Sequence, residues 1–174
     1  LVKEVYLPAR QGSLQVEMLA APRRHGMLSY QLAPRFENLL REVAAGTPVI
    51  VLQDYGVWPF SLWHYAVVVG YDHENSEVLL RSGEKQRLRM PFAVLEYTWR
   101  DNGYWAMVAV PPDQVPATAT EPEYLAAVLA LERIGDTRAA RSGFAALLGR
   151  WPGNLSASIG LANSYYKLGE LQQS

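Results

Sequence analysis

A cluster of prolines after residue 110 is the sequence feature that most constrains the fold of this chain. Four prolines occupy positions 111, 112, 116 and 122, within a Thr/Ala-rich stretch. Proline fixes φ and lacks a backbone N–H, so the cluster is typical of an extended linker. The composition also changes here, from β-branched and aromatic runs before the prolines to an Ala/Leu-rich pattern after them. We therefore expect a first domain over residues 1–111, a Pro-rich linker over 112–121 and a helical part over 122–174.

The composition allows a folded core and excludes several classes of partner. Hydrophobic residues make up 49% of the 174 and charged residues 19%, unlike a disordered chain. The 16 basic and 17 acidic residues nearly cancel, so no overall field favours nucleic acid. Without cysteine, the chain has no disulfide, zinc–thiolate site or thiol nucleophile of its own. No apolar run reaches the length of a transmembrane segment, about 18 residues, and no signal peptide is visible.

The first part combines helical patterns with strand patterns. Ser13 is the expected cap of the first helix, Gly26 its expected end, and Pro22 predicts that it kinks or ends early. Two helices followed by several mainly antiparallel strands predict an α+β fold. The expected elements, in order, are a helix over 14–25, a strand over 27–31, a helix between 34 and 46, strands over 48–53, 63–71, 77–81 and 86–90, a short helix over 92–99 and a strand over 104–110.

The second part contains a repeat of helical patterns. Gly135 and Gly169 lie 34 residues apart, and each follows a helical pattern. After Gly135, small Ala140 and large Phe144 fall on one helix face. A 34-residue helix–turn–helix period resembles the tetratricopeptide repeat (TPR), of which the chain would hold about one and a half copies. An ordinary helical hairpin is the alternative. The match departs from the repeat at Val128 and Leu147, where small residues are usual.

His64 is the histidine whose surroundings suit chemistry best. His25 lies at a helix end, where the macrodipole favours a cation, and His73 lies in a polar turn. His64 opens the apolar run 65–71 and follows the aromatic-rich loop 55–63. Partial desolvation at such a position tunes an imidazole toward general-base work. A structural histidine with satisfied hydrogen bonds is the alternative. The sequence shows no spaced metal ligands, so we expect neither a metal nor a cofactor.

Three consecutive segments together resemble the peptidase C39 family. They are Gly46-Thr-Pro-Val-Ile-Val-Leu-Gln53, the aromatic loop and the strand that begins with His64. These are papain-like cysteine peptidases, best known for cutting bacteriocin leaders after a double glycine. The resemblance covers residues 5–110. It implies a helix pair with an antiparallel sheet, hydrolase activity and a peptide or protein substrate. The TPR-like tail is similar to that of bacterial C39-like proteins with appended repeats, many of them exported. The resemblance therefore also implies a periplasmic or membrane-anchored lipoprotein.

The resemblance assigns His64 as the general base that activates the family's cysteine thiolate. The family's cysteine and its oxyanion-holding glutamine belong to a helix that precedes the segment Val5-Tyr6-Leu7-Pro8. We therefore expect residues 1–111 to form an N-terminally incomplete domain. Where the family has Asp-Pro, this sequence has Ser82-Gly83. Ser82 is thus the candidate stand-in for the acid: it can hold the imidazole by a hydrogen bond but brings no charge. Asp54 and Asp72 are further carboxylates, which the sequence does not place.

Two functional interpretations remain open. In the first, the intact parent is a C39-like cysteine peptidase with a TPR-type docking tail, and this cysteine-free chain is inactive. In the second, the domain is a non-catalytic pseudo-peptidase that binds peptides, with the repeats as a scaffold for a protein partner. A missing helix would expose a core face and favour self-association. Strand alternation in the basic hairpin would put Arg81, Lys85, Arg87 and Arg89 largely on one face. This face is either a solvated surface or a site for acidic partners.

Overall fold

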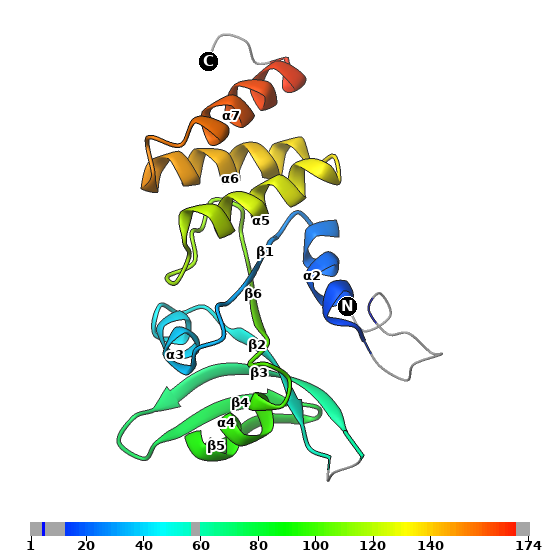
Figure 1. Cartoon of the computed structure of the whole chain (residues 1–174), viewed down its shortest axis with the longest axis vertical. Coiled ribbons are helices and arrows are strands. Elements are labelled where there is room, and N and C mark those ends of the chain that lie inside the picture. The colour runs from blue at the N-terminus through cyan, green and yellow to red at the C-terminus, as the bar shows by residue number, and fades with distance from the viewer. Residues whose placement is uncertain (1–4, 6–12, 57–59, 170–174) are drawn as a thin grey trace. The chain divides into compact units, whose positions relative to one another are not determined.

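The computed structural model describes residue 5, residues 13–56 and residues 60–169 (Figure 1). The chain forms two compact units. One comprises Leu1–Tyr30, Ala109–Val115 and Ala119–Ser174, and the other comprises Gln31–Val108 and Pro116–Thr118. Most of the expected segment Val5-Tyr6-Leu7-Pro8 and the middle of the aromatic loop, residues 57–59, lie outside the described residues.

The sheet confirms the predicted α+β class. Its six strands follow the order β1-β6-β2-β3-β4-β5, and β2 pairs antiparallel with β3 and β6, as do β3 with β4 and β4 with β5. β-Branched and aromatic runs form these strands because such side chains fit a pleated, half-buried surface. The strands are β1 (Leu28–Gln31), β2 (Val49–Asp54), β3 (Trp63–Asp72), β4 (Glu77–Ser82), β5 (Lys85–Pro91) and β6 (Ala106–Val110).

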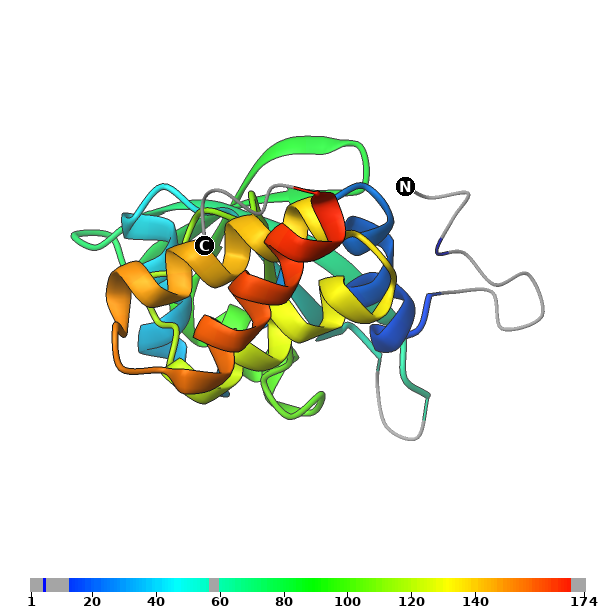
Figure 2. The ribbon, with the colours of Figure 1, turned by 90° about the horizontal axis from the view of Figure 1, so that it is seen from above.

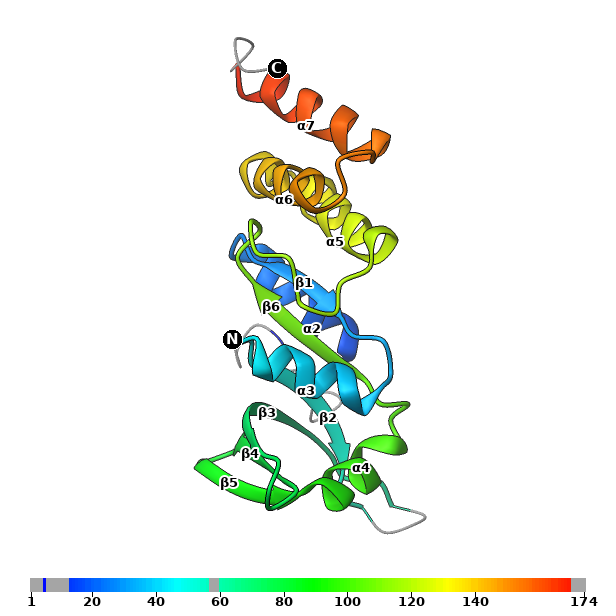
Figure 3. The same ribbon diagram turned by 90° about the vertical axis from the view of Figure 1, so that its left-hand side faces the viewer.

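Helices α3 (Phe36–Ala44) and α4 (Phe92–Arg100) belong to the same unit as β2 to β5. Figure 3 shows α4 beside the sheet. Leu95 and Trp99 of α4 are buried, as are alternate residues of the strands such as Val49 and Val51. The indole Nε1 of Trp99 donates to the carbonyl oxygen of Trp105 at 2.7 Å. Helix α4 thereby closes the core on one face of the sheet.

Glu42 of α3 is a fully buried acidic residue with three hydrogen-bond donors around it. Its side-chain oxygens accept from the Thr118 amide at 2.7 Å, the Thr118 hydroxyl at 2.6 Å and the Ala117 amide at 3.2 Å. Ala117 and Thr118 belong to no strand, so no ladder partner accepts from their amides, and Glu42 supplies the acceptors that this half-buried backbone requires. This side chain therefore ties the stretch to the unit of α3.

Helix α2 (Gln15–Arg24) differs from the prediction at both ends. Its N-cap is Leu14 rather than Ser13, and it runs through Pro22 to Arg24 without ending early. Pro22 lies in the last turn, where it lacks the N–H that would donate to the Met18 carbonyl, and its own carbonyl accepts from the amides of His25 and Met27. Gly26 has φ 70°, the left-handed conformation expected of a helix-ending glycine.

Three helices, α5 (Glu121–Arg133), α6 (Thr137–Arg150) and α7 (Leu155–Leu168), form the C-terminal part. Figures 2 and 3 show them stacked in chain order. Side-chain oxygens of Asp136 and Asn154 cap α6 and α7 by accepting from backbone amides. The Phe144 ring is fully buried against Gly160, where a Cβ atom would lie 2.4 Å from the ring. The C-terminal helical hairpin predicted from the 34-residue period is confirmed.

Val128 shows how the helices accommodate a departure from the repeat pattern. Val128 is fully buried in α5, at a position where the repeat usually has a small residue. Its side chain faces Gly143 of α6, where an added Cβ atom would lie only 2.8 Å away. Here the small residue lies on the facing helix, at Gly143, and it allows α5 and α6 to approach closely.

None of the helices among residues 13–56 and 60–169 combines the length and the hydropathy needed to cross a membrane.

Tyr65 of β3 gives a pH-dependent stability that can be measured. Its ring packs edge-on against Trp105, with centroids 5.7 Å apart, and burial raises the pKa of Tyr65 to about 12. A raised folded-state pKa means that the folded state favours the neutral phenol. The contribution of this preference to the free energy of unfolding is therefore complete below pH ~10 and is lost as the pH rises toward ~12. The difference in unfolding free energy between the native chain and Tyr65→Phe should therefore change between these pH values. A difference that stays constant there would contradict the assignment.

Candidate functional site

Strand register places a group of polar side chains on one face of the sheet. Gln53 of β2 lies directly opposite His64 of β3. Directly opposite residues of an antiparallel pair share a face, and so does Tyr55, two residues beyond Gln53. On β4, Arg81 pairs with Val67, which puts the next residue, Ser82, on the same face as His64. The sheet alone thus gathers residues that are distant in sequence.

His64 and Ser82, the two site residues selected from the sequence, are in contact. The Nε2 atom of His64 lies 2.8 Å from Oγ of Ser82. Both side chains are half-buried. The Tyr55 ring lies against the imidazole, with centroids 5.8 Å apart. The imidazole is therefore held from two sides, by a hydroxyl and by an aromatic ring.

A second layer of hydrogen bonds lies beneath this pair. The Tyr55 hydroxyl donates to Oε1 of Gln53 at 2.9 Å. Gln53 is completely buried, and its Nε2 donates to Oγ1 of Thr98 on α4 at 2.7 Å. Burial raises the pKa of Tyr55, which keeps the phenol protonated. The sequence analysis missed Tyr55, Gln53 and Thr98. The signal for this group is Gln53, a glutamine at the end of an apolar strand. A buried amide there requires hydrogen-bond partners, which Tyr55 and Thr98 provide.

The His64 side chain faces a cavity of about 530 Å³. Apolar Leu88 and Met90 of β5 form part of its wall, while the charged Glu84 and Lys85 lie at the β4–β5 turn. The remaining lining residues are Tyr55, Ser82 and Gly83. An apolar wall with a few polar groups is the usual composition of a ligand site.

Asp54 accepts hydrogen bonds from residues of the segment between β2 and β3. Its Oδ1 accepts from the Gly56 amide at 2.8 Å and from the Leu62 amide at 2.7 Å. Burial alone would raise the pKa of Asp54, but hydrogen bonds from the Ser61 side chain and these two amides outweigh it and lower the pKa. The carboxylate thus holds the backbone at Gly56 and Leu62, on the two described sides of the loop.

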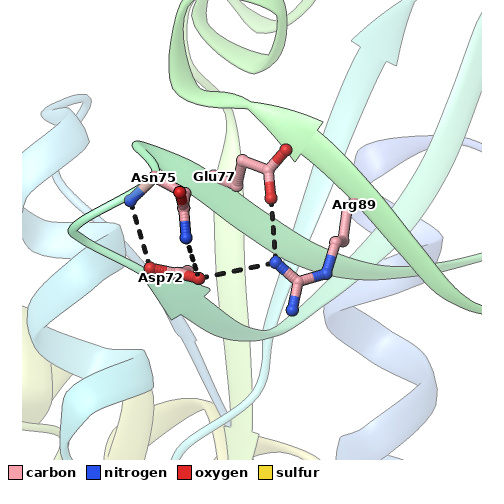
Figure 4. Close-up of polar contacts among 4 residues, drawn as sticks. All are labelled: Asp72, Asn75, Glu77 and Arg89. Atoms are coloured by element: carbon pink, nitrogen blue, oxygen red, sulfur yellow. Dashed lines mark hydrogen bonds and ion pairs between the residues drawn. The ribbon is translucent and has the colours of Figure 1, made fainter.

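Asp72 lies at the other end of β3 from His64, about 26 Å away along an extended strand. Figure 4 shows it bonded to Asn75 and Arg89. It accepts from the Asn75 side chain at 2.8 Å, and Arg89 lies 3.4 Å from Asp72 and 3.0 Å from Glu77. In the described part of the chain, Ser82 is the side chain that hydrogen-bonds the His64 ring, and no carboxylate does so.

The basic hairpin divides between two faces. Arg81, Arg87 and Arg89 line a groove of about 570 Å³ whose apolar floor includes Val69 and Leu79. Lys85, which the sequence placed largely with them, lies at the His64 cavity instead. The β4–β5 register shifts between Leu80 and Ser82, and this irregularity breaks the simple alternation from which the prediction was made. Within the described residues, no three His, Asp or Glu side chains gather as metal ligands would.

Two comparisons with known proteins gave a match. The model of the Peptidase_C39 like family matches residues 20–107, which include His64 and Ser82. The crystal structure of a "putative C39-like peptidase" from Bacillus anthracis matches at 20% sequence identity and a TM-score of 0.48. That match covers 57% of this chain and 60% of the other. No curated protein matches the sequence.

Proposed function

This chain belongs to the Peptidase_C39 like family. We propose that it contributes the catalytic histidine, but not the cysteine, of a cysteine-peptidase site. In this proposal His64 is the general base and Ser82 is the residue that holds it. The observation that carries the proposal is the 2.8 Å contact between Nε2 of His64 and Oγ of Ser82 beside an open cavity. A general base needs such a fixed orientation and access to its substrate.

The chemistry would be acyl transfer. The imidazole takes the proton of a cysteine thiol, the thiolate attacks the peptide carbonyl, and the imidazolium returns the proton to the leaving amine. Water then hydrolyses the thioester. The chain has no cysteine, so the thiol would have to come from residues outside these 174. The chain by itself is expected to turn over no peptide by this route.

A pseudo-peptidase that binds peptides is the second candidate, and Ser82 is the observation that favours it. A hydroxyl is neutral, so it orients an imidazole without stabilising the imidazolium as a carboxylate does. The cavity with Leu88, Met90 and Lys85 would then hold a peptide without cutting it. In either case the TPR-like helices would dock a protein partner. The exposed Leu155, Ile159 and Tyr166 of α7 support this role.

Thiol labelling of the natural protein that contains these residues separates the two candidates. A thiol paired with His64 would be a thiolate at about pH 6, whereas an ordinary cysteine, with pKa near 8.5, would not. Labelling by iodoacetamide at that pH should therefore fall about tenfold or more in His64→Ala. His73→Ala is the matched control, because His73 is an exposed turn residue, and it should label like the native protein.

Two results would exclude the peptidase. One is a parent protein without a cysteine upstream of this segment, and the other is labelling that does not respond to His64→Ala. Binding of a fluorescent peptide to the cysteine-free chain, without cleavage, would then support the peptide-binding module.

A further inference from the structure

We propose that the groove lined by Arg81, Arg87 and Arg89 is a docking site for a segment of a partner protein that combines acidic and apolar residues. The groove lies on the face of the sheet opposite to His64, because Arg81 pairs with Val67, which follows His64 by three residues on β3. The proposal therefore goes beyond the proposed function and does not rest on it.

A bulge in β3 builds the apolar floor of this groove. The register of β3 with β4 shifts between Val68 and Gly70, so Val69 is an extra residue without a partner on β4. Val69 is 38% exposed and lines the groove together with Leu79. Gly70 lies opposite Leu79, and an added Cβ atom there would lie 3.1 Å from a methyl carbon of Leu79. The bulge and the glycine thus leave two apolar side chains in the floor, within reach of a ligand.

Among the described residues, two of the three guanidinium groups of the groove have no carboxylate partner. Arg89 is the paired one, since its Nη1 lies 3.0 Å from Glu77 and 3.4 Å from Asp72 (Figure 4). The other two belong to Arg81 and Arg87, both of which are exposed. These two cations lie on neighbouring strands, where like charges destabilise a sheet. A bound carboxylate would offset that repulsion.

The chemistry of the groove favours an acidic peptide over other anionic partners. A guanidinium group presents a planar fork of N–H donors that matches the two oxygens of a carboxylate. The apolar floor suits an aliphatic side chain beside that carboxylate, and the volume of about 570 Å³ lies within the range of ligand sites, roughly 300–1,000 Å³. Anionic membranes are bound by clusters of about 4–8 basic residues, and nucleic acids by a comparably broad basic surface. Two unpaired arginines in a chain of net charge −1 form a smaller footprint.

Fluorescence anisotropy of a labelled peptide measures the binding. The probe is a fluorescein-labelled synthetic peptide in which glutamates flank leucines, and the control peptide has glutamine in place of every glutamate. The 174-residue chain should bind the acidic peptide, and added salt should weaken this binding by screening the charges. The glutamine peptide should bind about tenfold more weakly or less, because it lacks the charge-assisted hydrogen bonds.

The decisive variant combines Arg81→Gln with Arg87→Gln, and it should weaken binding of the acidic peptide about tenfold or more. Substitutions of exposed side chains such as these leave the fold intact. The matched control combines Arg100→Gln with Arg138→Gln. It changes the net charge equally at exposed positions outside the groove, so it should bind like the native chain. Val69→Thr keeps the β-branched shape but places a hydroxyl in the floor, and it should weaken binding severalfold.

The proposal is overturned if the native chain does not bind the acidic peptide, or if the variant without Arg81 and Arg87 binds it as tightly. Vesicles with phosphatidylserine and a single-stranded RNA are the competing probes. Binding of either one through the two arginines, without binding of the peptide, would also overturn the proposal and assign the groove to that partner.

His64→Ala separates this groove from the cavity on the other face. It should bind the acidic peptide like the native chain, because the groove and His64 lie on opposite faces of the sheet. The readout needs no thiol and no activity. A failure of the thiol-labelling experiment would therefore leave this result standing, and the reverse is also true.

Discussion

Phe144→Ala is expected to lower the free energy of unfolding of the C-terminal helices by about 3–5 kcal/mol. The Phe144 ring is fully buried and lies against the backbone of α7 at Gly160. Removing it loses the burial of an aromatic ring and leaves a cavity between α6 and α7, which two rigid helices cannot fill by a small shift. The measurement is urea denaturation followed by far-UV circular dichroism. A loss below about 1 kcal/mol would contradict the close packing of these helices.

A double-mutant cycle tests whether the expected loss of stability comes from the contact between Phe144 and Gly160. Gly160→Ala adds a Cβ atom where the ring lies 2.4 Å away, so this substitution alone should also destabilise, by about 1–3 kcal/mol. In Phe144→Leu the missing ring atoms give the methyl group room. The double variant should therefore lose less stability than the sum of the two single variants, whereas additive losses would mean that the two sites do not touch. Gly149→Ala is a matched control, since nothing lies within 4 Å of an added Cβ atom there.

Glu42→Ala is expected to cost about 3 kcal/mol, the second largest effect. The substitution leaves the Ala117 amide and both donors of Thr118 without their acceptor, and an unsatisfied buried donor costs roughly 1–3 kcal/mol. Glu42→Gln keeps the shape but points an amide group at donors, so an intermediate loss is expected. Urea denaturation measures the loss, and hydrogen exchange at the Thr118 amide should accelerate. Native-like exchange in Glu42→Ala would show that Glu42 does not hold this segment.

Patterns local in the sequence predicted most of the fold. The strand expected over 48–53 is observed as Val49–Asp54, and the strand expected over 63–71 as Trp63–Asp72. Both were predictable because an apolar, β-branched run bounded by turn residues is typical of a buried strand. The helix expected between 34 and 46 also formed, and it ends before Gly46, which has φ 83°. Pro22 did not end the helix early: a proline removes the helical bond of its own missing N–H, and α2 still continues to Arg24.

The candidate site was less predictable, because its geometry depends on pairing between distant segments. His64 and Ser82 came from the resemblance to a family. Tyr55 and Gln53 join them only through the register of β2 with β3, and Thr98 only through the packing of α4. No local period encodes which residue of one strand lies opposite which residue of another. For the same reason the sequence could not separate Lys85 from Arg87 and Arg89.

Strand β5 lies at an edge of the sheet, which suggests a further role for its basic residues. The last strand of an open sheet presents unpaired N–H and C=O groups to which another chain can add. On β5, Lys85, Arg87 and Arg89 are exposed, and Pro91 ends the strand. Charges and proline at an edge oppose such intermolecular pairing. We therefore expect these side chains to oppose aggregation through the β5 edge of the sheet.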